Sequence, residues 1–157
     1  MRYIKYLRYL VLHKYYVFIE SIKLGIPIRG FFHDMEKFLP REFIGYAKHF
    51  YDKSGNIKIG MDILYNGLPR DHEIKFLRWY RHHVTQNKHH WQFWVITDNT
   101  GKHYILPIDL DTRKEMLADW KSVSKVLKQP DIKKWYIEHQ DKVILDDESK
   151  EWFLNNI

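Results

Sequence analysis

The chain of 157 residues contains no cysteine, which excludes disulfide bonds and thiolate metal ligands. It also lacks long apolar runs, because charged residues such as Arg8, Lys14 and Glu20 interrupt each hydrophobic stretch of the N-terminal segment. That segment is too polar for the core of a signal peptide and for the ~20 apolar residues of a membrane span. We therefore expect a cytoplasmic protein with no membrane partner.

Runs of five or more basic residues are absent as well. The chain carries 26 Lys and Arg against 20 Asp and Glu, a net charge of +6. This excess favours an acidic partner such as a nucleotide phosphate. Because the basic residues are spread along the whole chain, nucleic acid is an unlikely general ligand.

Hydrophobic and aromatic residues are plentiful, at 45% and 17% of the chain. A chain of this length and composition is expected to form one compact domain, residues 1–157, with a core dominated by Trp, Tyr and Phe. Histidine is the compositional outlier, with ten residues. Without thiols, any metal ion must be held by His, Asp and Glu.

The first half of the chain has helical periodicity. Apolar residues recur at helical spacing over 2–23, and Gly25 followed by Pro27 ends this predicted helix. A short helix is predicted over 28–38, and Pro40 suits the first turn of a third helix.

The remaining segments predict a mostly α fold with a small β-hairpin. The turn-rich loop, the helices and the hairpin are expected as follows: a loop over 52–70 with a short helix at 61–65, a helix from Asp71, a hairpin in "FWVITDNTGKHYIL", and helices over 112–128, 130–141 and from a cap at Asp146 or Asp147 to about Asn155.

A histidine and an aspartate, His33 and Asp34, stand side by side next to Phe31 and Phe32 in "GFFHDMEKFLP". A buried polar pair must be hydrogen-bonded, paired or bound to a metal. Other polar residues in apolar surroundings extend the set: His13, His83, His89, His90 and Asp119.

The spacing of the later histidines constrains a shared site. His83 and His90 are two helical turns apart and share one face of a continuous helix, whereas His89 lies on another face. Their Cα atoms would be ~10.5 Å apart in a straight helix. We therefore expect a bend near Asn87–Lys88 or a site for two ions, with His90 favoured over His89 as the partner of His83.

The order His, His-Asp, His, His, Asp resembles the HD-domain superfamily of helical metal-dependent phosphohydrolases, in particular its subgroup with two extra histidines. The segment "HDMEK" fits the His-Asp-x-x-Lys pattern of that superfamily. Together with "NKHHWQFW" and "EMLADW", most of residues 10 to 140 is similar to a small family of bacterial and phage proteins of unknown function. The two extra histidines depart from the superfamily, since they lie within eight residues instead of on separate helices.

The resemblance implies an HD-like domain with one or two metal ions. The first ion would be bound by His13, His33, Asp34 and Asp119; the second by His83 and either His90 or His89, with Asp34 bridging both. Imidazole and carboxylate ligands suit Mn, Fe, Co, Ni or Zn better than Mg.

The chemistry of such a metal site suggests roles for neighbouring residues. Asp34 and Lys37 would be catalytic, with Lys37 one turn from Asp34 and acting as a phosphate clamp. Substrate contacts are predicted for Lys37, Arg41, Lys88, Trp91 and Glu115. Trp91 would stack a base, an interaction worth ~1–3 kcal/mol.

Three functions remain open at this point. The favoured one is hydrolysis of a small phosphate ester, a nucleotide, by metal-activated water. A di-iron oxygenase of the same superfamily would share the six ligands. A non-enzymatic basic helical binding module would use the histidines structurally. The sequence makes no prediction of oligomeric state.

Overall fold

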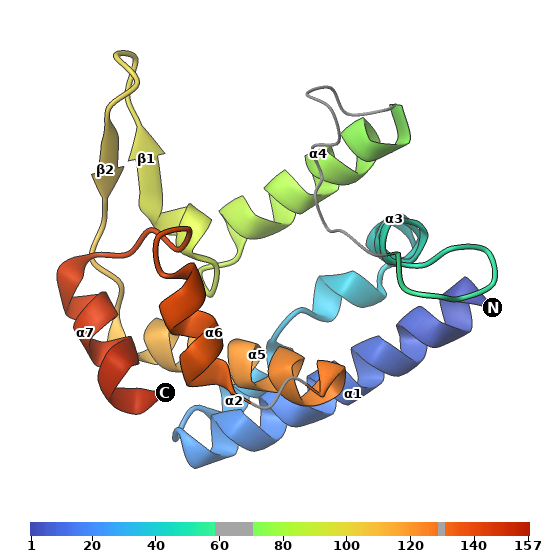
Figure 1. Ribbon diagram of the computed structural model, residues 1–157, viewed down its shortest axis with the longest axis horizontal. Helices are drawn as coiled ribbons and strands as arrows, with labels where there is room; N and C mark the ends of the chain where they lie inside the picture. Colours follow the sequence, from blue (N-terminus) through green and yellow to red (C-terminus); the bar gives the residue numbers. More distant parts are fainter. Residues whose placement is uncertain (59–70, 129–130) are drawn as a thin grey trace. The chain divides into compact units, whose positions relative to one another are not determined.

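The structure, a computed structural model, describes residues 1–58, 71–128 and 131–157, leaving aside the side chains of 71–73 and 75. Its described part is mostly helical and has one two-stranded antiparallel sheet (Figure 1). The predicted fold class, mostly α with a small β-hairpin, is confirmed. Contacts divide the chain into two compact units, residues 1–12 with 34–83 (unit 1) and residues 13–33 with 84–157 (unit 2). The expectation of one domain stays a prediction.

Most of the predicted elements are present, with bounds close to those expected. The helices and strands are α1 (Arg2–Lys23), α2 (Pro27–Phe32), the 3-10 helix η1 (Met35–Phe38), α3 (Pro40–Phe50), α4 (Asp71–Gln86), the 3-10 helix η2 (Trp91–Trp94), β1 (Val95–Thr97), β2 (His103–Ile105), α5 (Leu110–Leu127), α6 (Ile132–His139) and α7 (Asp147–Asn156). The short helix predicted at 61–65 and the helix start at Pro130 lie outside the described residues.

The continuous helix predicted over 28–38 is wrong, because the chain leaves the helical conformation at His33 and Asp34. His33 has φ −50° and ψ 127°, and Asp34 lies in the left-handed region with φ 53°. The Lys14 ammonium donates to the carbonyls of Gly30 and His33. These carbonyls at the end of α2 are thus satisfied without another helical turn.

Unit 1 has an aromatic core. Tyr6 and Leu10 of α1 pack with Tyr46 and Ala47 of α3 and with Phe76 of α4, all of them buried. The Tyr46 ring meets the Phe76 ring edge-on, with centroids 5.2 Å apart. This core fixes the elements that carry the polar residues of unit 1.

Unit 2 is built around α5, which contacts α2, α6 and α7. Figure 1 shows these elements gathered around the orange helix α5. Met116 and Leu117 of α5 pack with Tyr136 of α6 and Phe153 of α7 in a core that excludes water. The N-cap of α7 is Asp146, as predicted, and its side chain accepts from the Ser149 amide at 3.0 Å. Packing of the apolar face of α5 therefore fixes the orientation of the polar residues on the other face of this helix.

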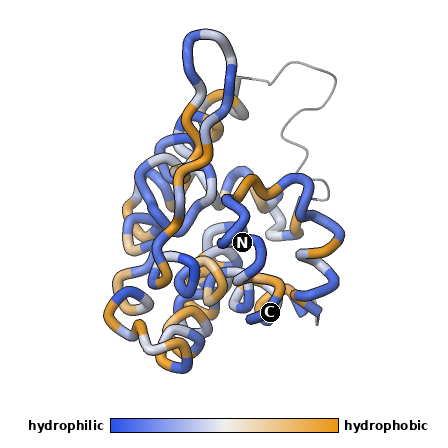
Figure 2. Tube along the Cα trace, turned by 90° about the vertical axis from the view of Figure 1, so that its left-hand side faces the viewer, coloured by the Kyte–Doolittle hydropathy of each residue, from blue (hydrophilic) through white to orange (hydrophobic). Residues whose placement is uncertain are grey.

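The hairpin pairs Val95 with Ile105 and Thr97 with His103. Its turn is stabilised by the Asp98 carboxylate, which accepts from the amides of residues 100 and 102, and by Gly101 at φ 83°. Figure 2 shows the turn as hydrophilic. The hairpin is mostly exposed and contributes little to the core.

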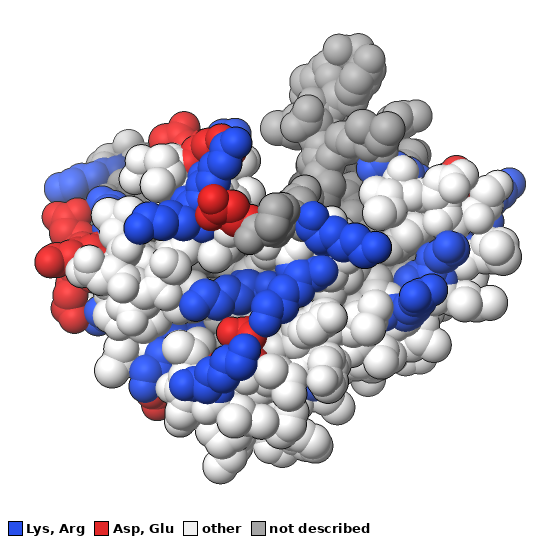
Figure 3. Space-filling view, turned by 60° about the horizontal axis from the view of Figure 1, so that its bottom comes forward, with Lys and Arg blue, Asp and Glu red and all other residues white. Residues whose placement is uncertain are grey.

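No helix in the described ranges is both long and apolar enough to span a lipid bilayer. Figure 3 shows one face of the molecule, on which Lys and Arg side chains lie in several separate groups. This distribution agrees with the even spread of basic residues along the sequence. The cytoplasmic location stays a prediction.

Gly30 brings α2 against α1 in unit 2, and we expect Gly30→Ala to be destabilising. A Cβ at this position would meet Ser21 Cβ and Oγ at distances that real Cβ atoms essentially never show. Overpacking of this kind costs roughly 1–3 kcal/mol, which a thermal melt detects. Gly45→Ala is the matched control, since its Cβ would meet Trp79 at an ordinary 3.7 Å. Adding Ser21→Gly to Gly30→Ala should restore stability in part; a melt unchanged by Gly30→Ala alone would contradict this close packing.

Candidate metal centre

Three side chains of unit 2 converge around Asp119. His13 comes from α1, His33 follows α2, and Asp119 comes from α5; their exposed fractions are 3%, 2% and 8%. His13 Nε2 lies 3.3 Å and His33 Nε2 lies 3.7 Å from Asp119 Oδ1. One ligand atom from each of the three residues lies within 4.8 Å of the others. We call this group the Asp119 cluster.

The helical phase of α5 explains this arrangement. Glu115, Asp119 and Ser122 are spaced by four and three residues, so they share one face of the helix. All three are buried, while the neighbouring Met116 and Leu117 enter the apolar core. Helix α5 thus presents a buried polar stripe on the side away from its apolar packing.

Ser122 fixes the tautomer of His13. The Ser122 hydroxyl donates to the His13 carbonyl at 2.8 Å and lies 3.0 Å from His13 Nδ1. Because its proton is used on the carbonyl, the hydroxyl can only accept from Nδ1–H. The neutral imidazole then has its lone pair on Nε2, the atom that faces Asp119.

Glu115 has the same effect on His33. Its Oε1 lies 3.1 Å from His33 Nδ1 and 3.3 Å from His89 Nδ1. Burial raises the pKa of Glu115, but hydrogen bonds from His33 and His89 outweigh it and lower the pKa from 4.5 to about 2. The ionised carboxylate accepts from both Nδ1–H groups. His33 therefore also turns an Nε2 lone pair toward Asp119.

The outcome is a buried site for positive charge. Two imidazole lone pairs and a carboxylate oxygen face one another, and acceptors in such proximity require a cation or shared protons between them. Hydrogen bonding of the second ring nitrogen is the arrangement that orients metal-binding histidines in proteins. Sequence reasoning found His13, His33 and Asp119 but missed Ser122, whose only signal was its spacing of three residues from Asp119.

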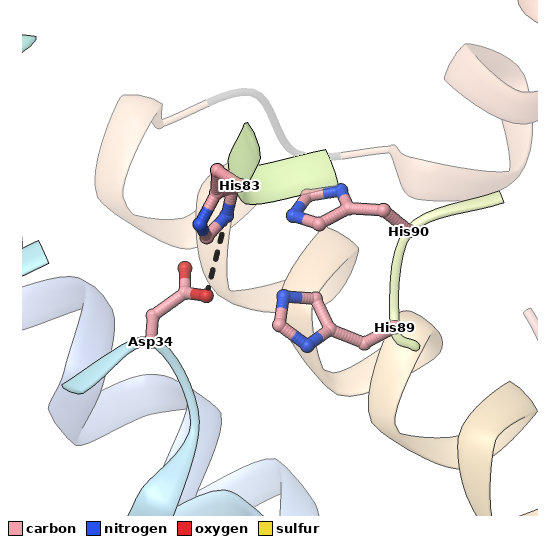
Figure 4. Close-up of side chains that lie close together, drawn as sticks. All are labelled: Asp34, His83, His89 and His90. Atoms are coloured by element: carbon pink, nitrogen blue, oxygen red, sulfur yellow. Dashed lines mark ion pairs between the residues drawn. The ribbon is translucent and has the colours of Figure 1, made fainter. Parts of the chain in front are cut away.

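In unit 1, Asp34 and His83 lie together. Figure 4 shows the Asp34 carboxylate directed at the His83 ring, with Oδ1 3.4 Å from Nε2. His83 Nδ1 lies 3.0 Å from Glu36 Oε1, so a carboxylate stands at each ring nitrogen. The Lys37 ammonium donates to Asp34 Oδ2 at 2.5 Å, and it also lies over the Tyr46 ring. The predicted pair of Asp34 and Lys37 is therefore in direct contact.

His89 and His90, in unit 2, follow the end of α4. The preference for His90 used helical phase, whereas α4 ends at Gln86, directly before the bend expected near Asn87–Lys88. Which of the two histidines is a ligand stays a prediction. His89 is buried, with 4% of its surface exposed, while His90 is half-buried. Figure 4 shows their two rings as neighbours, with centroids 4.4 Å apart. His89 is the one that contacts Glu115.

The predicted substrate residues lie in different surroundings. In unit 1, the Arg41 guanidinium stacks on the Trp79 ring at 3.5 Å. Both residues line an open surface hollow of about 550 Å³ with Arg78 and His82. In unit 2, Lys88 is exposed and its carbonyl accepts from the Trp94 indole, and Trp91 packs half-buried against the apolar core. Glu115 contacts histidines and also Arg29, at 3.4 Å.

Fold and cluster together define a mostly helical protein with buried histidine–carboxylate groups. The chain belongs to the family of unknown function DUF5662, whose family model matches residues 2–157. Comparison with curated proteins and with solved structures gave no match. The similarity to a family of unknown function is thus confirmed, while membership of the HD-domain superfamily stays a prediction.

Proposed function

We propose that this protein is a metal-dependent phosphohydrolase of the HD type that acts on a small phosphate ester, a nucleotide. The observation that carries the proposal is the Asp119 cluster, in which Ser122 and Glu115 hold two imidazoles with their Nε2 lone pairs toward one buried carboxylate. Nitrogen and oxygen donors in this combination suit Mn, Fe, Co, Ni or Zn.

His13, His33 and Asp119 would hold the ion. By the resemblance, Asp34, which follows His33 in the sequence, would complete the ligand set. When bound, such an ion supplies Lewis acidity, which polarises a phosphoryl oxygen and lowers the pKa of water. The protein's own part is to fix the orientation and the tautomer of both imidazoles and to exclude bulk water from Asp119. Lys37 is held at Asp34, and by the resemblance it would act as a phosphate clamp.

The hollow around Arg41 supports an anionic, planar substrate. Two guanidinium groups, Arg41 and Arg78, line it together with Trp79. Guanidinium groups bind phosphate oxygens with matched geometry, and the Arg41 guanidinium, which itself stacks on the Trp79 ring, can stack on a base. This combination favours a nucleotide over a phosphate ester without a ring.

The proposal is tested with a panel of nucleoside mono-, di- and triphosphates and simple phosphate esters, each with Mn²⁺, Co²⁺, Fe²⁺ or Mg²⁺. Phosphate release that requires a transition metal ion is the expected result. If no phosphate compound is turned over by protein with stoichiometric metal, the proposal fails. Coloured protein with redox-active iron and no phosphatase activity would point to the oxygenase instead.

We expect Arg41→Ala and Arg78→Ala to raise the KM of the nucleotide substrate by about tenfold, which corresponds to one hydrogen bond to a charged group. Metal content should not change, because neither residue belongs to the Asp119 cluster. Lys53→Ala, which removes an exposed positive charge elsewhere in unit 1, is the control for net charge. Equal effects of all three variants would show a general charge effect and contradict binding in the hollow.

A further inference from the structure

A second group of potential metal ligands lies within unit 1 and involves two residues that the sequence did not single out. Glu36 comes from η1, Glu42 from the first turn of α3, and His83 from α4. One ligand atom of each lies within 4.8 Å of the others. The packing of η1 against α3 brings the two acids together.

Glu42 is the unusual member of this group. It is 6% exposed, and its Oε2 has no hydrogen-bond partner among the residues that the structure describes. Burial, followed by the charge of Glu36, raises the pKa of Glu42, although Lys37 and Arg41 oppose the shift. A buried carboxyl oxygen without a partner is costly, and a cation at this point would remove the cost.

The surroundings fit a hydrated ion. Tyr46 lies one helical turn after Glu42, and its hydroxyl is also buried and without a hydrogen-bond partner in the described part of the chain. Burial raises the pKa of Tyr46, so the hydroxyl keeps its proton and is a donor. An ion carrying a water molecule would give this hydroxyl a partner as well.

His83 can serve such an ion with Nδ1. That nitrogen lies 3.0 Å from Glu36 Oε1, and Nε2 faces Asp34 Oδ1 at 3.4 Å. Without an ion, Nδ1–H donates to Glu36; burial raises the pKa of Glu36, but this hydrogen bond outweighs it and the pKa is lowered. An ion would displace this proton and take the Nδ1 lone pair, while Nε2–H donates to Asp34. A carboxylate on the opposite ring nitrogen is a usual feature of metal-binding histidines.

We propose that Glu36, Glu42 and His83 form a separate cation site in unit 1, which takes one divalent transition metal ion such as Mn²⁺ or Zn²⁺. Two carboxylates and one imidazole are a suitable ligand set for these ions. The site shares no residue with the Asp119 cluster and does not depend on the proposed function. In this site His83 binds the ion together with Glu36 and Glu42, whereas the resemblance paired His83 with His89 or His90.

The test compares metal stoichiometry in full-length protein. Metal-stripped wild type, Glu42→Gln and Asp119→Asn are dialysed against Mn²⁺ or Zn²⁺, and bound metal is measured by elemental analysis and titration calorimetry. We expect each variant to lose one ion per chain and the double variant to lose two. Glu138→Gln, an exposed acid on α6, should lose none.

Wild-type stoichiometry and affinity in Glu42→Gln would overturn the proposal, even if Asp119→Asn loses its ion. If Glu42→Gln loses an ion and Asp119→Asn does not, the result supports this site and counts against the Asp119 cluster. If Glu42→Gln does not fold, Glu36→Gln takes its place, since Glu36 is 30% exposed and lies on a short 3-10 helix. Bound Co²⁺ gives a second measurement, because its visible spectrum should change in Glu36→Gln and remain in Glu138→Gln.

Discussion

Asp119→Asn should remove the metal ion of the Asp119 cluster and lower kcat/KM for phosphate release by at least ~1000-fold. The amide is a much weaker ligand than the carboxylate, and the Lewis acidity lost with the ion is worth several kcal/mol of barrier, each 1.36 kcal/mol being tenfold. Metal content and steady-state kinetics measure the two effects. Asp111→Asn is the control, because Asp111 is on the same helix but 55% exposed.

In the metal-free protein, the same substitution should not be harmful. Without an ion, the Asp119 carboxylate and the two imidazole nitrogens need a shared proton between them, whereas an asparagine amide could donate to one nitrogen without it. Asp119→Asn in EDTA should therefore be at least as stable as the wild type in a thermal melt. Metal at 1,000 times its Kd for the Asp119 cluster should stabilise the wild type by about 4 kcal/mol more than the variant.

If Asp119→Asn in EDTA has a free energy of unfolding roughly 3–5 kcal/mol below that of the wild type, this account is contradicted. Such a difference is the typical cost of breaking a buried ion pair by removing one partner. It would mean that His13 and His33 carry the positive charge as imidazolium groups, and that Asp119 has a structural role. Stability without metal thus separates the metal centre from a buried salt bridge.

The elements themselves could be predicted because their signals are local. Apolar periodicity gave the bounds of α1, Pro40 gave the start of α3, and Asp146 capped α7 as expected. The break at Asp34 could not be predicted in the same way. It depends on Lys14, which is distant in sequence and satisfies the last carbonyls of α2.

The candidate site was predictable only for residues whose chemistry is costly to bury. His13 and Asp119 stood out in apolar surroundings, and the structure brings them together. Ser122 did not stand out, because a serine on a helix is usually exposed or neutral. Glu42 was missed for another reason: an acid in the first turn of a helix is already explained by the helix dipole. The choice of His90 over His89 used helical phase past Gln86, where α4 ends, and it stays a prediction.

Glu115→Gln should weaken metal binding at the Asp119 cluster by about 10–100-fold without abolishing it, as is typical for residues that orient metal ligands. Glu115 accepts from His33 and His89 through Oε1, and its Oε2 faces Arg29. A neutral amide would make His33 less basic, and its NH₂ group would oppose the Arg29 guanidinium. Competition with a chelator measures the affinity, and Glu148→Gln, an acid that pairs with Arg113 and is 73% exposed, is the control.

A purely structural role of Glu115 predicts a different pair of results. The melting temperature of the metal-free variant would fall, while the affinity of the folded protein for metal would stay at the wild-type value. Ser122→Ala provides the parallel case at His13, where two neutral hydrogen bonds are lost. The Glu115 carboxylate is charged and contacts two imidazoles, whereas the Ser122 hydroxyl is neutral and contacts one. Glu115→Gln should therefore reduce metal affinity more than Ser122→Ala; the reverse order would rule out the electrostatic part of this explanation.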